Sequence, residues 1–483
     1  MHKQDYSISS LDTLFSPRSL AVIGVSSDPN TIFNAGNLFV EALQDFGYGG
    51  QLYLVGNSGG ELRGLKVYKN IVDIPGDVEY AIAAIPNQNM PQLVEDCGRK
   101  KVKFIHLFSS GFGEIEDSMG TGLQREMLKI AARYHVRLLG PNCMGVYCPQ
   151  TGLTFAERFS RTAGHVSYLS QSGGQSIIGI REATQRGIFF SKVVSYGNAC
   201  DINECDLIEY FTHDPDTGII TAYIEGTSDG ARLYRALKEA SVKKPVVVFK
   251  CAATEGGRHA AVSHTSAIAG SNKTWDSLLR QTGAIRVHNV KEMFDVVTVL
   301  QRCVKPEGLK TLVVGHGGGT CVQATDDCCR AGLTVPLLPV KYRQALMKIY
   351  FTDAGNIFKN PVDINPYWGM EFAGEAFKAV ADWPEADVIL IPAVPEQNPF
   401  RSREIQYQIY VDTFIQWVGM SSKPTVVALT VNTMPGADGL PERSFQKMVD
   451  AGLAVFPSVQ RAATAVHRVY QYHQWLKKHT SKT

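Results

Sequence analysis

Short runs of apolar and β-branched residues alternate along the chain with stretches of helical periodicity. Residues 1–150 contain five such runs, which end at Gly, Pro, Ser or Asn: SLAVIGV, QLYLVG, EYAIAAIP, KFIHLFSSG and RLLGPN. Continuous apolar runs of this length are typical of buried parallel strands. Helical patterns such as PQLVEDCGRK and GLQREMLKIAARYH separate them. This alternation predicts an α/β fold with a doubly wound parallel sheet.

Two further sets of strands follow the first. The segment from Pro149 to Gly164 interrupts the alternation and is predicted to be a linker. The second set is HVSYLSQSGG, SKVVSYGN, GIITAYIEG, KPVVVFK and AIRV, followed by a helix near Asn289. The third set is TLVVGHGGG, LTVPLLP, DVILIPAV, PTVVALT and LAVFPS, closed by a helix near Val459 to Lys478. We therefore expect three doubly wound domains, over residues 1–150, 160–305 and 306–480.

Composition narrows the class of protein. The 483 residues carry 48 basic and 46 acidic side chains, so a net charge of +2 gives no electrostatic basis for binding nucleic acid or an anionic membrane. The N-terminal sequence has no signal-peptide pattern, and the longest apolar runs are strand-sized. Ten cysteines in a chain of this length are not a disulfide framework. We expect a cytoplasmic protein with reduced thiols.

The loops after the strands are where chemistry is expected, because ligands of open α/β sheets bind beyond the carboxyl ends of the strands. Gly24, Ser26 and Ser27 follow the first strand and suit a phosphate at a helix N-terminus, although an ordinary tight turn remains an alternative. The G-x-G-x-x-G pattern is absent and no acidic residue closes the second strand. An NAD-binding function is therefore not favoured.

Two glycine-rich loops predict anion binding at helix N-termini. In LSQSGG, Ser172, Gly173 and Gly174 offer a hydroxyl and free N–H groups to a phosphate, or Ser172 simply caps the helix. In VVGHGGGT, residues 317–319 repeat this arrangement before another helix, and the neighbouring His316 is either a ligand or a solvated loop residue. The two loops are predicted to face one anion from both sides.

Other strand-end residues have both a functional and a structural interpretation. Glu225 ends the run TAYIEG and is either catalytic or a helix-cap partner. Asn142 and Cys143 lie in the turn GPNCMG, where a packed thiol is favoured over a nucleophile because no base is evident in the sequence. His259 and His264 are five residues apart, unlike the H-x-x-x-H spacing of metal sites, and no metal is expected.

The setting of His264 favours phosphoryl transfer. It lies in SHTSAIAGS among small and hydroxylated residues, in a loop that can move and surround an anion with donors. An imidazole that is held by a carboxylate on one nitrogen has the other nitrogen available as a nucleophile. Glycine-rich helix N-termini would then stabilise the phosphoryl oxygens.

Several stretches in fixed order resemble one known family. They are LFSPRSLAVIGVSSDP, HVRLLGPNCMG, YLSQSGG, SKVVSYGNACDINECDLIEYF, DPDTGIITAYIEG, KKPVVVFK and SHTSAIAGS. The chain resembles the α subunit of ADP-forming (NDP-forming) acyl-CoA synthetases, relatives of the succinyl-CoA synthetase α subunit. The resemblance implies a CoA-binding Rossmann-like domain followed by two flavodoxin-like ligase domains.

The resemblance also assigns roles to individual residues. It implies that His264 is phosphorylated, that Glu225 orients it, and that residues 172–174 and Gly317, Gly318 and Gly319 hold the phosphoryl group. It places Asn142 and Cys143 at the acyl site. The residues implied to bind coenzyme A are Gly24, Ser26, Ser27, Asn57, Ser58, Pro86, Ser109 and Ser110.

The implied reaction converts a carboxylate, CoA and ATP into acyl-CoA, ADP and phosphate through an acyl phosphate and the phosphohistidine. ATP or ADP with Mg²⁺ would bind a separate ATP-grasp β subunit in an α2β2 heterotetramer. The chain departs from the family at VGNSGG, where Ser58 replaces a lysine, at SHTS, at GHGGG, and at Arg258 and His259. A CoA- or acyl-CoA-binding paralogue without ligase activity is the alternative.

Overall fold

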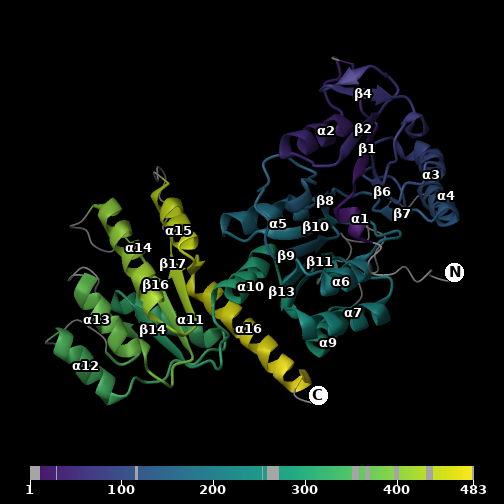
Figure 1. Cartoon of the computed structure of the whole chain (residues 1–483). Coiled ribbons are helices and arrows are strands. Elements are labelled where there is room, and N and C mark those ends of the chain that lie inside the picture. The colour runs from purple at the N-terminus through teal and green to yellow at the C-terminus, as the bar shows by residue number, and fades with distance from the viewer. Residues whose placement is uncertain are drawn as a thin grey trace. The chain divides into compact units, whose positions relative to one another are not determined.

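The computed structural model describes most of the chain as helices around three sheets (Figure 1). The described residues are 11–28, 30–114, 118–252, 254–257, 271–350, 358–364, 370–395, 402–430 and 439–480. His264, Arg258 and His259 lie outside them. The chain forms two compact units, Met1–Thr184 with Ile188–Val290, and Gln185–Gly187 with Lys291–Thr483. The α/β fold class is confirmed, whereas the three predicted domain boundaries stay predictions.

The first sheet has seven strands in the order β3-β4-β2-β1-β5-β6-β7. Every pair is parallel except β3 with β4. The strands are β1 Ser19–Ile23, β2 Gln51–Val55, β3 Glu61–Leu62, β4 Leu65–Tyr68, β5 Tyr80–Ala83, β6 Phe104–Leu107 and β7 Arg137–Leu139. Strands β2 and β4 lie on one side of β1, and β5, β6 and β7 lie on its other side, so the strand order reverses between β1 and β5. In such sheets, a ligand crevice forms at this reversal.

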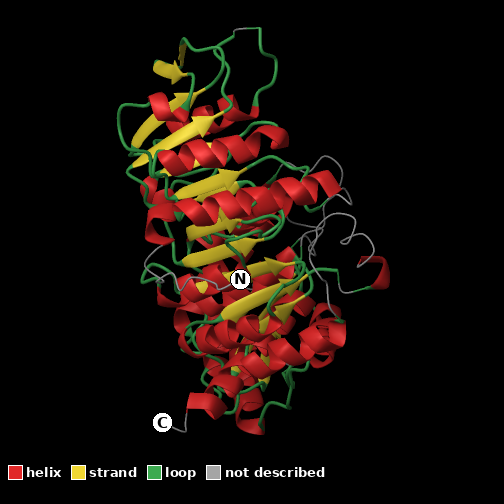
Figure 2. Cartoon of the chain, turned by 90° about the vertical axis from the view of Figure 1, so that its right-hand side faces the viewer, coloured by secondary structure: helices red, strands yellow, loops and turns green. Residues whose placement is uncertain are grey.

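Helices flank this sheet (Figure 2). They are α2 Ala35–Phe46, α3 Met90–Arg99 and α4 Ser118–Tyr134, with short 3-10 turns η2 Ile71–Asp73 and η3 Asn87–Asn89. The short helix α1 Asp12–Phe15 instead packs Phe15 on Tyr210 and Phe211. Asn34 caps α2 by accepting from the Asn37 N–H, and Gly47 ends it in the left-handed conformation. Strands β1 and β5 are buried along their whole length, which explains their continuous apolar sequence.

The second sheet has six strands in the order β13-β12-β11-β9-β10-β8. Its strands are β8 Gly145–Tyr147, β9 Val166–Ser170, β10 Phe190–Ser195, β11 Ile219–Ile224, β12 Val246–Lys250 and β13 Ile285–Val287. Its helices are α5 Gly173–Gln185, α6 Glu204–His213, α7 Gly230–Lys243 and α9 Asn272–Thr282. Only β8 is antiparallel; the sequence did not predict it, and it pairs with β10 although it lies within the range of the first predicted domain.

A charge network joins the first two sheets. Arg137 on β7 contacts Asp201 at 2.9 Å and Asp206 at 3.5 Å, and Asp206 also accepts from Arg232 at 2.7 Å. The Asp201 carboxylate accepts the Leu138 N–H as well. Because the Arg137 side chain is largely buried, this network ties the start of β7 firmly to residues of the second sheet's loops and helices.

The predicted linker contains one 3-10 turn, η4 Pro149–Thr151, and a bridge between Cys148 and Leu153. No other helix or strand occurs between η4 and Gly164, as predicted. Phe155 and Phe159 are nevertheless buried and pack edge to face, so this segment is part of the core.

The second unit contains a five-stranded parallel sheet in the order β15-β14-β16-β17-β18. The strands are β14 Thr311–Gly315, β15 Val362–Asp363, β16 Val388–Ala393, β17 Thr425–Leu429 and β18 Ala454–Phe456. The helices are α10 Val290–Arg302, α11 Gly318–Arg330, α12 Val340–Tyr350, α13 Met370–Ala381, α14 Arg403–Met420, α15 Leu440–Asp450 and α16 Val459–Thr480. The predicted closing helix is confirmed as α16.

The prediction of a strand over LTVPLLP is wrong. Only Thr334 makes a ladder contact, an isolated bridge with Lys310. Pro336 and Pro339 have no N–H to donate, so a continuous strand cannot form there. The edge position beside β14 is taken by β15 instead. Within the described ranges, no helix is long and apolar enough to cross a membrane.

Candidate functional site

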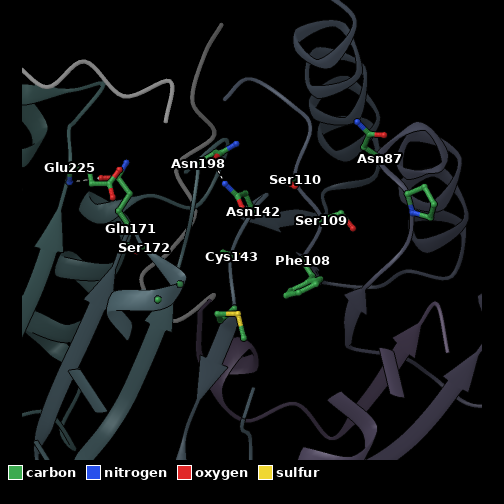
Figure 3. A pocket seen from close by; sticks show the side chains of 14 residues that line it. Asn87, Phe108, Ser109, Ser110, Asn142, Cys143, Gln171, Ser172, Asn198 and Glu225 are labelled. Carbon is green, nitrogen blue, oxygen red and sulfur yellow. Dashed lines mark hydrogen bonds between the residues drawn. The ribbon is translucent and has the colours of Figure 1, made fainter. Parts of the chain in front are cut away.

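A cavity of about 720 Å³ lies in the first unit, beyond the carboxyl ends of strands from both sheets (Figure 3). Parallel strands bring their carboxyl ends to one edge, so loops distant in sequence meet there. Nine of the predicted site residues line the cavity: Pro86, Ser109, Ser110, Asn142, Cys143, Ser172, Gly173, Gly174 and Glu225. Five lining residues were not predicted: Asn87, Phe108, Met144, Gln171 and Asn198.

Glu225 has one carboxylate oxygen that lacks a hydrogen-bond partner among the described residues. It follows β11 directly, and its Oε1 accepts from the Tyr223 hydroxyl at 3.3 Å. Its Oε2 is buried without a hydrogen-bond partner among the described residues. The backbone N–H of Glu225 donates to Gln171 Oε1 at 2.8 Å, and Figure 3 shows the two side chains next to each other. A buried carboxylate oxygen without a partner is costly unless a donor from a ligand or another segment reaches it.

The N-terminus of α5 forms another part of the cavity wall. Ser172 Oγ accepts from the Gln175 N–H at 3.4 Å, so the predicted capping role is present. For the N–H groups of Gly173 and Gly174, no acceptor lies among the described residues. A Cβ at Gly173 would lie 2.9 Å from Met144 Cγ, which makes a larger residue unfavourable. The start of this 13-residue helix therefore offers free N–H groups beside Glu225.

Asn142 lies in the turn after β7 in the left-handed conformation, with φ 59°. Its amide donates to Asn198 Oδ1 at 3.5 Å (Figure 3), and Asn198 in turn donates to the Glu114 carboxylate. Glu114 also accepts the Phe112 N–H at 3.1 Å. This chain of hydrogen bonds connects loops from both sheets and orients Asn142 toward the cavity.

Cys143 is a packed thiol. Its Sγ lies 3.8 Å from the Leu107 carbonyl oxygen and 3.7 Å from that of Leu139. Burial raises the pKa of this thiol well above its ordinary value, so the thiolate is strongly disfavoured. The structure thus supports packing over a nucleophilic role, as the sequence favoured, while contact with an acyl group stays a prediction.

His106 contacts the backbone of this turn, a role that the sequence did not predict. The residue lies on β6, is completely buried, and places Nε2 at 2.9 Å from the Cys143 carbonyl oxygen. Burial lowers the pKa of His106 from 6.5 to about 4, with the hydrogen bond to Cys143 opposing. The imidazole is therefore neutral at physiological pH and acts as a donor to the turn.

The predicted coenzyme A residues after β1 and β2 do not line the cavity. Ser27 Oγ lies 2.9 Å from Ser58 Oγ, which also accepts the Ser27 N–H at 3.1 Å. A Cβ at Gly24, where φ is +99°, would clash with the Ala84 carbonyl oxygen. Asn57 is exposed beside Ser58. The two loops are thus in direct contact, and their binding of CoA stays a prediction.

Gly317, Gly318 and Gly319 belong to the second unit. Gly317 precedes α11, and its N–H donates to Asp363 Oδ1 at 2.9 Å. His316 Nδ1 lies 3.7 Å from the same carboxylate oxygen. An anion at this helix would therefore meet a neighbouring carboxylate, a feature that the sequence did not predict. The role of these glycines in holding a phosphoryl group stays a prediction.

Family comparisons identify the type of chain. Residues 18–149 match a family described as "CoA binding domain", and residues 163–300 match a "Succinyl-CoA ligase like flavodoxin domain". The α subunit of acetate–CoA ligase (ADP-forming) I from Pyrococcus furiosus is 34% identical over 482 residues, covering 98% of this chain and 100% of the relative. The chain belongs to the ADP-forming acyl-CoA synthetases.

A solved structure has the same fold as this acyl-CoA synthetase chain. It is acetyl-coenzyme A synthetase 1 of Ca. Korarchaeum cryptofilum, in complex with phosphate and ADP, with a TM-score of 0.81, 30% identity and 98% coverage of both chains. Other relatives are longer. Acetate–CoA ligase (ADP-forming) I of Archaeoglobus fulgidus is 34% identical over 80% of this synthetase chain but over only 55% of its own length.

Proposed function

We propose that this chain is the α subunit of an ADP-forming acyl-CoA synthetase that transfers a phosphoryl group through His264. The observation that carries the proposal is that Glu225, whose Oε2 lacks a hydrogen-bond partner among the described residues, and the free N–H groups of Gly173 and Gly174 lie on one cavity. A carboxylate acceptor beside an anion-binding helix N-terminus suits an imidazole that carries a phosphoryl group. His264 itself lies outside the described residues.

Glu225 would accept the N–H of one imidazole nitrogen of His264 and leave the other nitrogen for phosphorus. The Tyr223 hydroxyl fixes Glu225 Oε1, so the side chain is oriented before the histidine arrives. The N–H groups at the start of α5 would hold the phosphoryl oxygens. This arrangement would lower the barrier by positioning and by electrostatic stabilisation.

The two chemical steps balance within this site. A carboxylate oxygen of the acyl substrate attacks the phosphorus, the P–N bond breaks, and the imidazole keeps the electron pair. The CoA sulfur then attacks the carbonyl carbon of the acyl phosphate, and phosphate leaves with the thiol proton. Ser109, Ser110 and Asn142 line the cavity where the acyl group would react.

The charges in the cavity favour a monocarboxylate substrate. Among its described lining residues, Glu225 is the only charged side chain. A second substrate carboxylate would be repelled by Glu225, and the described lining residues offer no cation to offset this repulsion. We therefore infer that acetate or another monocarboxylate is used in preference to a dicarboxylate.

The nucleotide half-reaction would take place on a separate ATP-grasp β subunit in an α2β2 assembly. Support comes from the Pyrococcus relative, which is named an α subunit and matches this chain along its full length, whereas longer relatives extend beyond it. ATP or ADP with Mg²⁺ would bind the partner. In the described residues, no group of three or more potential metal ligands occurs.

Co-expression with an adjacent ATP-grasp chain tests this function. The complex should form acyl-CoA from acetate or a longer, branched or aryl monocarboxylate, with one ADP and one phosphate released for each acyl-CoA. Calorimetry of the chain with CoA supplies the second readout. CoA binding without any ligation by the complex would favour the alternative, a CoA-binding paralogue without ligase activity.

A further inference from the structure

Gln171 is a buried polar residue between two parts of the candidate site. It directly follows β9 and precedes Ser172 at the start of α5. Only 4% of the residue is exposed, and it lines the 720 Å³ cavity. Its backbone N–H donates to the Tyr223 carbonyl oxygen at 3.1 Å, which fixes the residue beside β11. A long polar side chain in this position needs partners for both ends of its amide.

The oxygen of the Gln171 amide accepts two hydrogen bonds. Oε1 accepts from the Glu225 N–H at 2.8 Å and from the Gly226 N–H at 3.2 Å. Two backbone donors at one atom identify that atom as the oxygen and occupy both of its lone pairs. Gln171 therefore holds the backbone of the turn that presents Glu225 to the cavity.

The nitrogen end has no such partner. Among the described residues, no acceptor lies within hydrogen-bond distance of Gln171 Nε2, which carries two N–H donors. Nε2 is not among the fully buried polar atoms that lack a partner, so it faces accessible space in which a ligand atom can accept its hydrogen bonds. Gln171 lines the cavity next to Glu225 (Figure 3), and Gly173 and Gly174 at the start of α5 line the same space.

We propose that Gln171 Nε2 donates to an oxygen of the phosphoryl group in this cavity while Oε1 holds the Glu225 turn. The inference rests on the proposed function, since it deepens the description of the same site. Gln171 then couples two requirements of phosphoryl transfer, because one rigid amide both contacts the transferred group and places the carboxylate that orients His264. A phosphate-type oxyanion is the ligand class that fits an N–H donor next to a helix N-terminus.

Two substitutions separate the two ends of the amide. Gln171→Glu keeps an oxygen for the Glu225 and Gly226 N–H groups but removes both Nε2 donors. Gln171→Leu removes the oxygen and the donors together at similar volume. Gln51→Glu is the charge-matched control, because Gln51 is an exposed residue of the same unit and lies outside the cavity.

The readouts are labelling of His264 by [³²P]phosphate with acetyl-CoA, and calorimetric binding of inorganic phosphate to the full chain. At pH 8, Gln171→Glu should lower both by about 10- to 100-fold, the range expected for losing one hydrogen bond to a charged group. At lower pH the new carboxyl becomes protonated and regains an O–H donor, so labelling should partly recover. Gln171→Leu should remain impaired at every pH.

The outcomes are distinct. If Gln171→Glu labels and binds phosphate like Gln51→Glu, the inference is wrong and the proposed function stands. If both Gln171 variants lose activity equally without recovery at low pH, the residue is only a structural clamp and the inference is also wrong. A wild-type chain that is not labelled but binds phosphate in a Gln171-dependent way refutes the proposed function alone. A wild-type chain that does neither refutes both.

Discussion

His106 should make the stability of the first unit depend on pH in mild acid. Its Nε2 faces the Cys143 carbonyl oxygen, which can only accept, so the neutral ring carries its proton there. Its Nδ1 is buried without a partner among the described residues. Protonation would place a charge in the core beside Phe39, whose ring packs edge to face on the imidazole. Burial therefore lowers the pKa to about 4.

The magnitude follows from linkage. Below pH 6.5 the unfolded chain binds a proton at this residue, whereas the folded chain binds it only near pH 4, so stability falls as pH falls through this window. Each pKa unit corresponds to about 1.4 kcal/mol, so lowering the pKa of His106 from 6.5 to about 4 corresponds to about 3 kcal/mol. This stability is fully present above pH 6.5 and is lost by pH 4.

Urea unfolding of the full chain between pH 7.5 and 4.5 measures this effect, with His106→Phe as the matched variant. Phenylalanine fills a similar volume and does not titrate, so the variant should be less stable at pH 7.5 but lose less stability on acidification. Between pH 7.5 and 4.5, the difference in free energy of unfolding between the wild type and His106→Phe should therefore shrink by roughly 2 to 3 kcal/mol. Deuterium exchange at the histidine C2 position reports the pKa directly. An equal pH dependence in both proteins, or a pKa of His106 near 6.5, would refute this reasoning.

Three further predictions concern the site. Glu225→Gln should reduce phosphate labelling of His264 by about 100-fold or more, because a neutral amide cannot stabilise a charged imidazole; labelling at the wild-type rate would contradict this. Ser58→Lys should tighten CoA binding by about two- to fivefold at low salt, with the gain disappearing in high salt, as calorimetry would show. An unchanged affinity would mean that no CoA phosphate lies near this turn. Cys143 should resist iodoacetamide at pH 8 under conditions that modify the exposed Cys329, as mapped by peptide mass spectrometry. Equal rates would show that Cys143 is accessible.

The sequence predicted most of the fold because buried parallel strands have an unmistakable apolar signature. Strands such as β1 and β11 are buried along their whole length, and each appears as a run dominated by apolar and β-branched residues. The elements that the sequence did not predict correctly are short or irregular. Strands β8 and β15 have three and two residues, which is too few for a periodic signal. The segment LTVPLLP has the right apolar content, but its prolines exclude a ladder.

The sequence predicted which site residues lie at the carboxyl ends of strands. Pro86, Ser109 and Ser172 were placed at carboxyl ends of strands, and these ends meet in the fold. Hydrogen bonds between residues that are distant in sequence could not be predicted. Gln171 lies in the motif LSQSGG, but its proposed role depends on a hydrogen bond from the backbone of Glu225, 54 residues away. His106 looked like an ordinary strand residue, because nothing local indicates that a carbonyl from another turn lies against its ring.

Mapping the phosphorylated residue tests the central claim most directly. The full chain is incubated with acetyl-CoA and [³²P]phosphate, and the labelled peptide is sequenced under alkaline conditions that preserve phosphohistidine. We predict acid-labile label on His264, lost in His264→Ala and retained in the matched variant His259→Ala. Label that persists in His264→Ala, or that is located on His259, would contradict the proposal that His264 carries the phosphoryl group.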